Sequence, residues 1–233
     1  MTHTAIDDGE RVRVGSELAA VSRALYERGW MPGTAGNLSV RLPGGAALIT
    51  ASGRDKGDMT AEDMVVVRAD TGEEAAPGRL QASAETTIHS AIYRTTDADA
   101  VIHVHSPYAT AVACRTGHRT RLTSLRIERL ELLKGLGLAD PTRTEVPVFP
   151  NWPEVPRIAA DVADHLAATP HAPPALLIGY FDLSSAGRKR DPESYRVITR
   201  AIGVPAHETV FFSDVGEELD AATAAEWRAV AVR

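Results

Sequence analysis

The stretch Val101-Ile102-His103-Val104-His105-Ser106 decides how this chain is interpreted, because it sets two histidines two residues apart on a β-branched run. Side chains at i and i+2 of a strand project from one face, so the sequence predicts a strand that presents two imidazoles side by side. Neutral imidazole suits zinc, and a catalytic zinc site takes three protein ligands and leaves one position open. His103 and His105 are therefore candidates for two of the three ligands. The alternative is a strand with two incidental histidines, whose ring nitrogens would then need other partners.

Composition is that of an ordinary globular protein of 233 residues, with 44% hydrophobic and 24% charged residues. This length suffices for one large domain or two small ones. The formal charge of −6 and the absence of a Lys/Arg block argue against nucleic-acid binding and favour a small-molecule substrate. Residues 1–15 carry no apolar segment, which predicts neither a secretory signal nor a membrane anchor. The single cysteine, Cys114, allows no intrachain disulfide, so a cytoplasmic protein is expected.

Hydrophobic periodicity predicts alternating helices and strands along the chain. Helices are expected from a cap at Ser16 to about Gly29, and over residues 83–95, 108–114, 128–136, 158–166, 195–202 and 219–227. Strands are expected over residues 38–42, 46–50, 65–67, 101–106, 146–149, 175–178 and 210–212. The first two strands read as a hairpin, with a loop rich in glycine and hydroxyl side chains on either side.

Five motifs carry a resemblance to a known family. They are Gly33-Thr34-Ala35-Gly36-Asn37-Leu38-Ser39, Thr50-Ala51-Ser52-Gly53-Arg54-Asp55-Lys56-Gly57, Ser83-Ala84-Glu85-Thr86, His103-Val104-His105-Ser106 and Glu131-Leu132-Leu133-Lys134-Gly135. One glycine loop alone would fit any tight turn, but the five in this order are specific. Together they resemble the class II aldolase/adducin family, and within it the methylthioribulose-1-phosphate dehydratases of methionine salvage. The resemblance implies an α/β fold, α/β/α in layers, with a mostly antiparallel central sheet.

The same resemblance implies a set of binding residues. His103 and His105 would bind one zinc ion per subunit. The residues around the substrate phosphate would be Asn37, Ser52, Gly53, Lys56 and Ser83. Backbone amides of a glycine loop can approach an anion closely, and Lys56 supplies positive charge, although a solvated surface lysine is the alternative for it.

The activity implied is zinc-dependent dehydration of 5-methylthioribulose 1-phosphate to 2,3-diketo-5-methylthiopentyl 1-phosphate, in a homo-oligomer that would be a tetramer. Such a reaction needs a Lewis acid and a carboxyl group that exchanges protons. Glu131 matches the dehydratase acid/base position and is favoured, whereas Glu85 matches the carboxylate of the related aldolases. Two alternatives remain open: aldol cleavage of a sugar phosphate, and a catalytically impaired remnant that serves as an interaction module.

The third metal ligand is where this chain departs from the family. Members carry a histidine after the strand that matches Pro174-Ala175-Leu176-Leu177-Ile178, but here Gly179-Tyr180-Phe181-Asp182 follows. Asp182, His165 and His171 are the candidates for a substitute.

From residue 179 onward the chain resembles a second family, the enolase-phosphatases of the haloacid-dehalogenase type. The matching segments are Gly179-Tyr180-Phe181-Asp182, Lys189-Arg190, Ser194-Tyr195, Phe212-Ser213-Asp214 and Glu218-Leu219-Asp220-Ala221-Ala222. Their Asp-x-Asp nucleophile does not follow a strand here, so neither phosphatase activity nor bound Mg²⁺ is expected. The expected division is a truncated class II aldolase/adducin-like domain over residues 1–178, followed by an incomplete, haloacid-dehalogenase-like βα fragment over residues 179–233.

Overall fold

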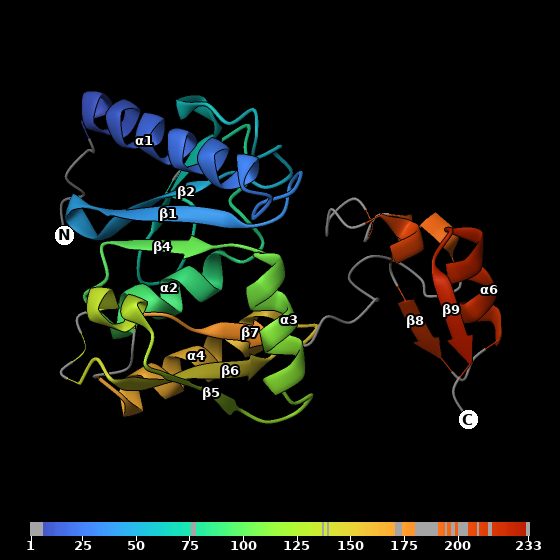
Figure 1. Cartoon of the computed structure of the whole chain (residues 1–233). Helices are drawn as coiled ribbons and strands as arrows, with labels where there is room; N and C mark the ends of the chain where they lie inside the picture. The colour runs from blue at the N-terminus through green and yellow to red at the C-terminus, as the bar shows by residue number, and fades with distance from the viewer. Residues whose placement is uncertain are drawn as a thin grey trace. The chain divides into compact units, whose positions relative to one another are not determined.

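The computed structural model of the chain describes residues 7–75, 78–136, 138, 140–170, 174–179, 191–193, 195–196, 199, 205–208, 210–213 and 216–231. The chain divides into two compact units, Met1–Tyr180 and Phe181–Arg233. The helices and strands of the first unit are α1 (Asp8–Glu27), β1 (Asn37–Leu42), β2 (Ala46–Thr50), β3 (Met64–Arg68), α2 (Thr86–Thr95), β4 (Ala100–His103), α3 (Pro107–Thr116), β5 (Thr123–Glu128), β6 (Arg143–Pro150), α4 (Val155–Ala168) and β7 (Leu177–Gly179) (Figure 1). Among the described residues of this unit, three 3₁₀ turns lie between these elements: η1 (Pro43–Gly45), η2 (Ala61–Asp63) and η3 (Glu131–Leu136). Among the described residues, no helix has the length and apolar character needed to cross a membrane.

The first sheet is antiparallel and has the strand order β3-β2-β1-β4. Val40 of the central strand β1 pairs with Leu48 of β2 on one side and with Ala100 of β4 on the other. The predicted hairpin is confirmed, and Gly44 supplies the left-handed backbone of its turn, with a φ of 75°. β4 is an edge strand, so the histidine motif begins on the rim of the sheet.

Helix α1 begins nine residues before the helix predicted from a cap at Ser16. The carboxylate of Asp7 accepts the backbone N–H of Glu10, which satisfies one of the free donors of the first turn. Ser16 lies inside the helix, and its hydroxyl donates to a carbonyl one turn earlier. Gly15 is present for packing, since an added Cβ would lie 3.0 Å from the carbonyl oxygen of Ala61.

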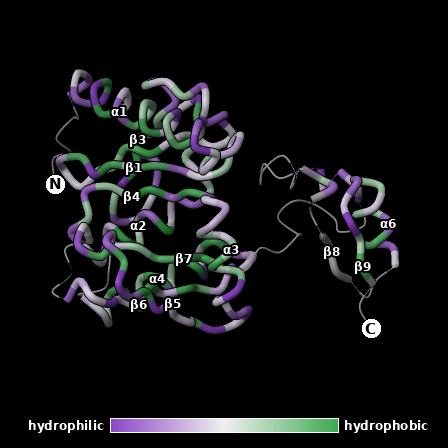
Figure 2. Tube along the Cα trace, in the orientation of Figure 1, coloured by the Kyte–Doolittle hydropathy of each residue, from purple (hydrophilic) through white to green (hydrophobic). Residues whose placement is uncertain are grey.

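Helix α1 covers one face of the first sheet and α2 covers the other (Figure 1). The core on the α1 side consists of Val14, Leu18, Ala19, Met31, Leu38, Leu42, Leu48, Met59 and Met64. The core on the α2 side consists of Ala47, Ile49, Ala51, Val65, Val67, Ala69 and Tyr93. Figure 2 shows hydrophobic residues along the strands between these helices. This packing fixes the start of α2 relative to the end of β4.

The other side of α2 packs on a second layer, made of α4 and the sheet β5-β6-β7. Leu125 of β5 pairs antiparallel with Val146 of β6, whereas Phe149 of β6 pairs parallel with Ile178 of β7. The shared core consists of Ile88, Ala91, Phe149, Ile158, Ala159 and Val162. The α/β fold with mostly antiparallel strands is therefore confirmed, because β6–β7 is the one parallel pair among the described strands of this unit.

The helix predicted over residues 128–136 is wrong. Residues up to Glu128 form β5, the backbone then turns at Arg129 with a φ of 56°, and a 3₁₀ helix begins at Glu131. Every second residue of β5 is partly buried, which is the period of a strand. The helical spacing of Leu130 and Leu133 favoured the helix prediction instead. Other boundaries in this unit differ from prediction by one to three residues, as at α2.

The second unit contains β8 (Val210–Ser213), α6 (Gly216–Ala224), β9 (Arg228–Ala231) and the 3₁₀ turn η5 (Ala206–Glu208) among its described residues. β8 and β9 pair in parallel with α6 between them in the chain. The predicted helix over residues 219–227 ends earlier, because Glu226 adopts a φ of 67° and leads into the unpredicted strand β9. The rings of Tyr195 and Trp227 pack edge to face at 5.2 Å in a small core of this unit.

Candidate active site

The ends of β1 and β4 bring Asn37 and His103 together, because these two residues pair across the antiparallel ladder. The chain enters β1 through Gly36, which has a φ of 77° and where an added Cβ would lie 2.7 Å from the His103 carbonyl oxygen. Only glycine permits this approach. Beyond β4, the backbone N–H of His105 donates to the carbonyl of Trp30 at 2.7 Å. The first glycine motif and the histidine motif therefore meet at one point.

The two histidine rings lie side by side, with their centroids 4.9 Å apart and their planes at 31°. The prediction that both histidines lie within the strand is wrong for His105, because β4 ends at His103 and His105 lies just beyond it. Burial lowers the pKa of His105, as does the charge of His103, while Glu85 acts in the opposite direction. An imidazole must be neutral to bind a metal ion, so a lowered pKa favours that state.

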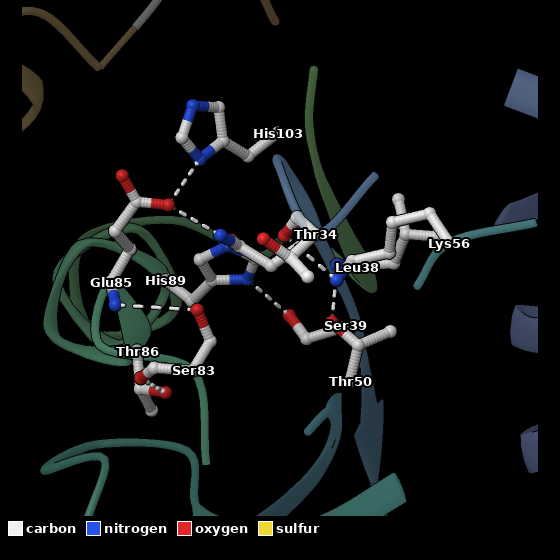
Figure 3. A network of polar contacts seen from close by, with 11 residues as sticks. Thr34, Leu38, Ser39, Thr50, Lys56, Ser83, Glu85, Thr86, His89 and His103 are labelled. Atoms are coloured by element: carbon white, nitrogen blue, oxygen red, sulfur yellow. Dashed lines mark hydrogen bonds and ion pairs between the residues drawn. The ribbon is translucent and has the colours of Figure 1, made fainter. Parts of the chain in front are cut away.

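Glu85 precedes α2 and reaches the first of these rings. Its Oε2 accepts from Nδ1 of His103 at 2.9 Å and from Nδ2 of Asn37 at 2.5 Å (Figure 3). Burial alone would raise the pKa of the Glu85 carboxyl, but the hydrogen bond and charge of His103 and the amide of Asn37 outweigh it and lower the pKa to about 2. The carboxylate is thus ionised and holds both neighbours in place.

Three further side chains, His89, Ser39 and Tyr93, extend this cluster, and the sequence motifs did not predict their part in it. Asn37 Oδ1 contacts the ring Nε2 of His89, Nδ1 of His89 lies 2.7 Å from Ser39 Oγ, and Ser39 Oγ lies 2.6 Å from the hydroxyl of Tyr93. Asn37, Ser39 and His89 are all buried. The sequence did carry one signal: Glu85 and His89 are four residues apart, a spacing that puts two side chains on the same face of a helix.

The buried state of His89 is expected to appear in the pH dependence of stability. Burial, together with the charge of His103, lowers the pKa of His89 from 6.5 to about 3, against the effect of Glu85. Between these values the unfolded chain binds a proton that the folded chain does not, so the free energy of unfolding falls as pH falls. Between pH 7 and pH 5, the metal-free wild-type protein should lose about 2 kcal/mol more than His89→Gln in urea denaturation. Equal losses in the two proteins would contradict a neutral buried ring.

The side chain of Lys56 connects the two glycine-rich loops by hydrogen bonds. This side chain is buried, and its ammonium donates to the carbonyls of Thr34 at 3.0 Å and Arg54 at 2.9 Å. Burial lowers the pKa of Lys56, while the charges of Asp55 and Glu85 act in the opposite direction. The alternative of a solvated surface lysine is therefore wrong. The positive charge lies beneath the loops, within electrostatic reach of Glu85.

Replacing Lys56 with Met is expected to lower the free energy of unfolding by about 2 kcal/mol, because two carbonyls lose their donor in a buried place. Met keeps the length of the apolar stem, so packing is largely retained. Urea denaturation measures the change. The matched control is Lys134→Met, whose side chain is 67% exposed and whose loss should matter by less than about 0.5 kcal/mol. A Lys56→Met protein as stable as the wild type would refute this role of the ammonium.

The remaining residues of the expected phosphate set lie at the start of α2 and on the loop after β2. Ser83 Oγ accepts the backbone N–H of Glu85 at 3.3 Å, so it stands at the start of α2. Ser52 and Gly53 are exposed on the loop after β2, and Gly53 has a φ of 69° with no atom within 4 Å of an added Cβ. The backbone N–H of Ser52 is already used by the carbonyl of Gln81.

Glu131 is not one of the hydrogen-bonded residues of the cluster. It opens the 3₁₀ helix η3, its side chain is 86% exposed, and its carboxylate pairs with Lys134 at 3.0 Å and 3.1 Å. An exposed pair of this kind contributes little to stability. The carboxylate of Glu131 is therefore accessible to solvent and held only by one exposed partner.

Of the three candidates for a third metal ligand, His165 is the one that lies among the described residues. His165 lies in α4, where its ring packs edge to face on Phe149 at 5.5 Å. Asp182 and His171 lie outside the described residues. Within the described part of the chain, no three His, Cys, Asp or Glu side chains are arranged to hold a metal ion. The cluster thus offers two adjacent imidazoles and a carboxylate that is hydrogen-bonded to one of them.

Residues 16–180 match the model of the class II aldolase and adducin N-terminal domain. The chain belongs to this family. The fold agrees: the crystal structure of L-fuculose-1-phosphate aldolase from Thermus thermophilus superposes with a TM-score of 0.54 at 30% identity, covering 72% of this chain and 76% of that one.

Curated relatives within the class II aldolase and adducin family carry dehydratase names. The methylthioribulose-1-phosphate dehydratase of Microcystis aeruginosa is 40% identical over 190 residues, which is 79% of this chain and 90% of that protein. A relative from Nocardia farcinica, named a probable bifunctional methylthioribose-1-phosphate isomerase/methylthioribulose-1-phosphate dehydratase, is 53% identical over 174 residues. That match covers 74% of this chain but only 31% of the longer relative.

Proposed function

We propose that this chain is a hydro-lyase that dehydrates 5-methylthioribulose 1-phosphate to 2,3-diketo-5-methylthiopentyl 1-phosphate with the help of zinc. The observation that carries the proposal is the cluster in which His103 and His105 lie side by side while Glu85 holds His103. The dehydratase names of relatives at 40% and 53% identity support the same substrate. The reaction takes a proton from carbon 3, next to the carbonyl, and releases the hydroxyl of carbon 4 as water.

We propose His103 and His105 as two of the ligands of one zinc ion per subunit, and the chemistry of the donors fits this. Nδ1 of His103 faces Glu85, so Nε2 is the nitrogen that remains for a metal. A metal-binding histidine commonly donates its other ring N–H to a carboxylate, which fixes the orientation and the tautomer of the ring. Zinc, when bound, supplies Lewis-acid stabilisation of the negative oxygens that develop beside the abstracted proton.

The substrate phosphate is proposed to bind beside this cluster, with Asn37, Ser52, Gly53, Lys56 and Ser83 around it. The exposed loop at Ser52 and Gly53 is open to a ligand. Lys56 would act through its charge from below the loops, because its ammonium already donates to two carbonyls. Removing that charge would therefore weaken phosphate binding without removing a direct contact.

Glu131 is proposed to exchange the proton with the substrate, and Glu85 is proposed to orient His103. Glu85 directs one oxygen to both His103 and Asn37, which suits a residue that orients its neighbours. Glu131 has an accessible carboxylate with one exposed partner, so it can accept and return a proton. The match of Glu131 to the dehydratase motif supports this division of roles.

A second candidate function is aldol cleavage of a sugar 1-phosphate. The observation that favours it is the position of Glu85 at the histidines, which matches the carboxylate of the related aldolases. An aldolase of this kind would break the bond between carbons 3 and 4 and release an aldehyde and a three-carbon ketone phosphate. Its product is therefore distinct from that of dehydration.

The test is to incubate zinc-supplemented protein with 5-methylthioribulose 1-phosphate and to identify the products by mass spectrometry. Dehydration gives a product lighter than the substrate by one water. Cleavage fragments would instead establish the aldolase. A folded, zinc-loaded protein that forms neither product would refute both functions and would favour a non-catalytic interaction module.

We further propose that the dehydratase part ends near residue 178 and that residues 179–233 derive from an enolase-phosphatase-like domain. The parallel β8-α6-β9 arrangement is compatible with such a fragment. A homo-tetramer, by resemblance to the family, and a cytoplasmic location complete the proposal. Light scattering of the purified protein measures the assembly.

A further inference from the structure

A buried run of hydrogen bonds leads from Glu85 into the sheet. Its members are, in order, Glu85, Asn37, His89, Ser39 and Tyr93, and Figure 3 labels Glu85, His89 and Ser39 among them. The three middle residues are each at most 2% exposed. The proposed function gives no task to the last three residues. Both ring nitrogens of His89 have hydrogen-bond partners, so the cost of burying the ring is offset and its orientation is fixed.

The end of the run at Glu85 sets the direction in which its protons point. Oε2 of Glu85 already accepts from His103, so it acts as an acceptor towards Asn37 as well. Asn37 must therefore present its Nδ2 hydrogens to Glu85, and its Oδ1 faces His89. An oxygen in that position requires a proton on Nε2 of His89.

The direction set at Glu85 continues to Tyr93. With its proton on Nε2, His89 has a bare Nδ1, which accepts the single proton of Ser39 at 2.7 Å. The oxygen of Ser39 then accepts the hydroxyl proton of Tyr93 at 2.6 Å. Every contact of the run is therefore satisfied by one neutral tautomer of His89, with its proton on Nε2.

The opposite tautomer would break the run at Glu85. With the proton on Nδ1, the bare Nε2 would attract the amide hydrogens of Asn37, and Oδ1 would turn towards Oε2 of Glu85. Two acceptors would then face each other at a separation of 2.5 Å with no proton between them. The carboxylate would have to move, and His103 with it. The tautomer of His89 is thus coupled to the geometry of the candidate metal ligand.

We infer that His89 is a positioning residue, which fixes the amide of Asn37 and through it the orientation of Glu85 and His103. The inference rests on the proposed function only for its effect on turnover. It is supported by the lowered pKa of His89, which keeps the ring neutral across the working pH range. Ser39 gives Nδ1 of His89 the donor that this tautomer needs, and Tyr93 gives one to Ser39.

Two substitutions separate this role from simple filling of space. In His89→Gln the side-chain amide carries an N–H at the place of Nε2 and can still donate to Asn37. In His89→Asn the amide occupies the place of Nδ1, so the contact with Ser39 survives and the donor to Asn37 is lost. We expect His89→Gln to keep kcat within about threefold of wild type. We expect His89→Asn to lower kcat at least about 30-fold with KM changed less than about threefold.

A second readout does not depend on turnover. In metal-free protein labelled with ¹⁵N, the His89 ring is expected to show the Nε2–H tautomer unchanged from pH 5 to pH 8. The side-chain amide of Asn37 should give one sharp pair of hydrogen resonances in wild type and His89→Gln. In His89→Asn the same pair should broaden or shift, because the amide is free to turn.

The outcomes distinguish the two proposals. An Nδ1–H tautomer, or equal losses of kcat in the two variants, would overturn the positioning role of His89. An inactive wild-type protein with the Nε2–H tautomer, and with an Asn37 amide perturbed only in His89→Asn, would refute the proposed function while supporting the positioning of Asn37. Equal amide spectra in all three proteins would refute that positioning, whatever the turnover.

Discussion

Replacing His103 with Ala is expected to remove bound zinc and to lower kcat/KM for 5-methylthioribulose 1-phosphate more than about 10³-fold. The size follows because the Lewis acid stabilises the developing negative charge by several kcal/mol, and each 1.4 kcal/mol is about tenfold in rate. Loss of the ring also frees Glu85, whose Oε2 it holds at 2.9 Å. Metal content after dialysis and steady-state kinetics measure the two effects.

Folding should survive this change. The His103 side chain is 23% exposed and lies on an edge strand, outside the apolar cores of the unit. The matched control is His118→Ala, because His118 lies on the exposed loop after α3. That variant should keep both zinc and activity. A His103→Ala protein that retains zinc and turnover would exclude this histidine as a ligand.

Much of the first unit could be predicted because its sequence patterns are local. The hairpin follows from alternating residues around Gly44, and α4 follows from apolar spacing at Ile158 and Val162. The start of α1 was missed, because Gly15 resembles a helix breaker when its packing against Ala61 is not known. β5 was missed because two competing periods overlap near Glu128.

The candidate site, too, could be predicted only in part from the sequence. Glu85 and His103 stand out as chemical groups within recognisable motifs, and their contact follows once α2 and β4 are packed together. The roles of Ser39 and Tyr93 could not be predicted, since both are ordinary residues for a buried strand and helix. Their contact depends on the packing of α2 on the sheet, which pattern reasoning does not provide.

Replacing Glu131 with Gln is expected to lower kcat by about 10² to 10⁴-fold with little change in KM, because a proton-exchanging group acts mainly in the transition state. Stability should change by less than about 0.5 kcal/mol, since the side chain is 86% exposed. Zinc content should be unchanged, because the carboxylate of Glu131 pairs with Lys134 and makes no hydrogen bond with either imidazole. Kinetics, metal analysis and urea denaturation of the same preparation test all three expectations.

Two matched variants decide whether the carboxylate of Glu131 itself matters. Lys134→Met removes its ion-pair partner at 3.0 Å and leaves the carboxylate, so most activity should remain if Glu131 exchanges the proton directly. Glu85→Gln keeps an oxygen towards His103 but replaces the carboxylate, so it should disturb zinc binding as well as turnover. If Glu131→Gln is silent while Glu85→Gln abolishes turnover with zinc retained, Glu85 is the working acid/base, as in the aldolases. The distinction is sharp because Glu85 is held by two neighbours at the histidines, whereas Glu131 is exposed with one exposed partner.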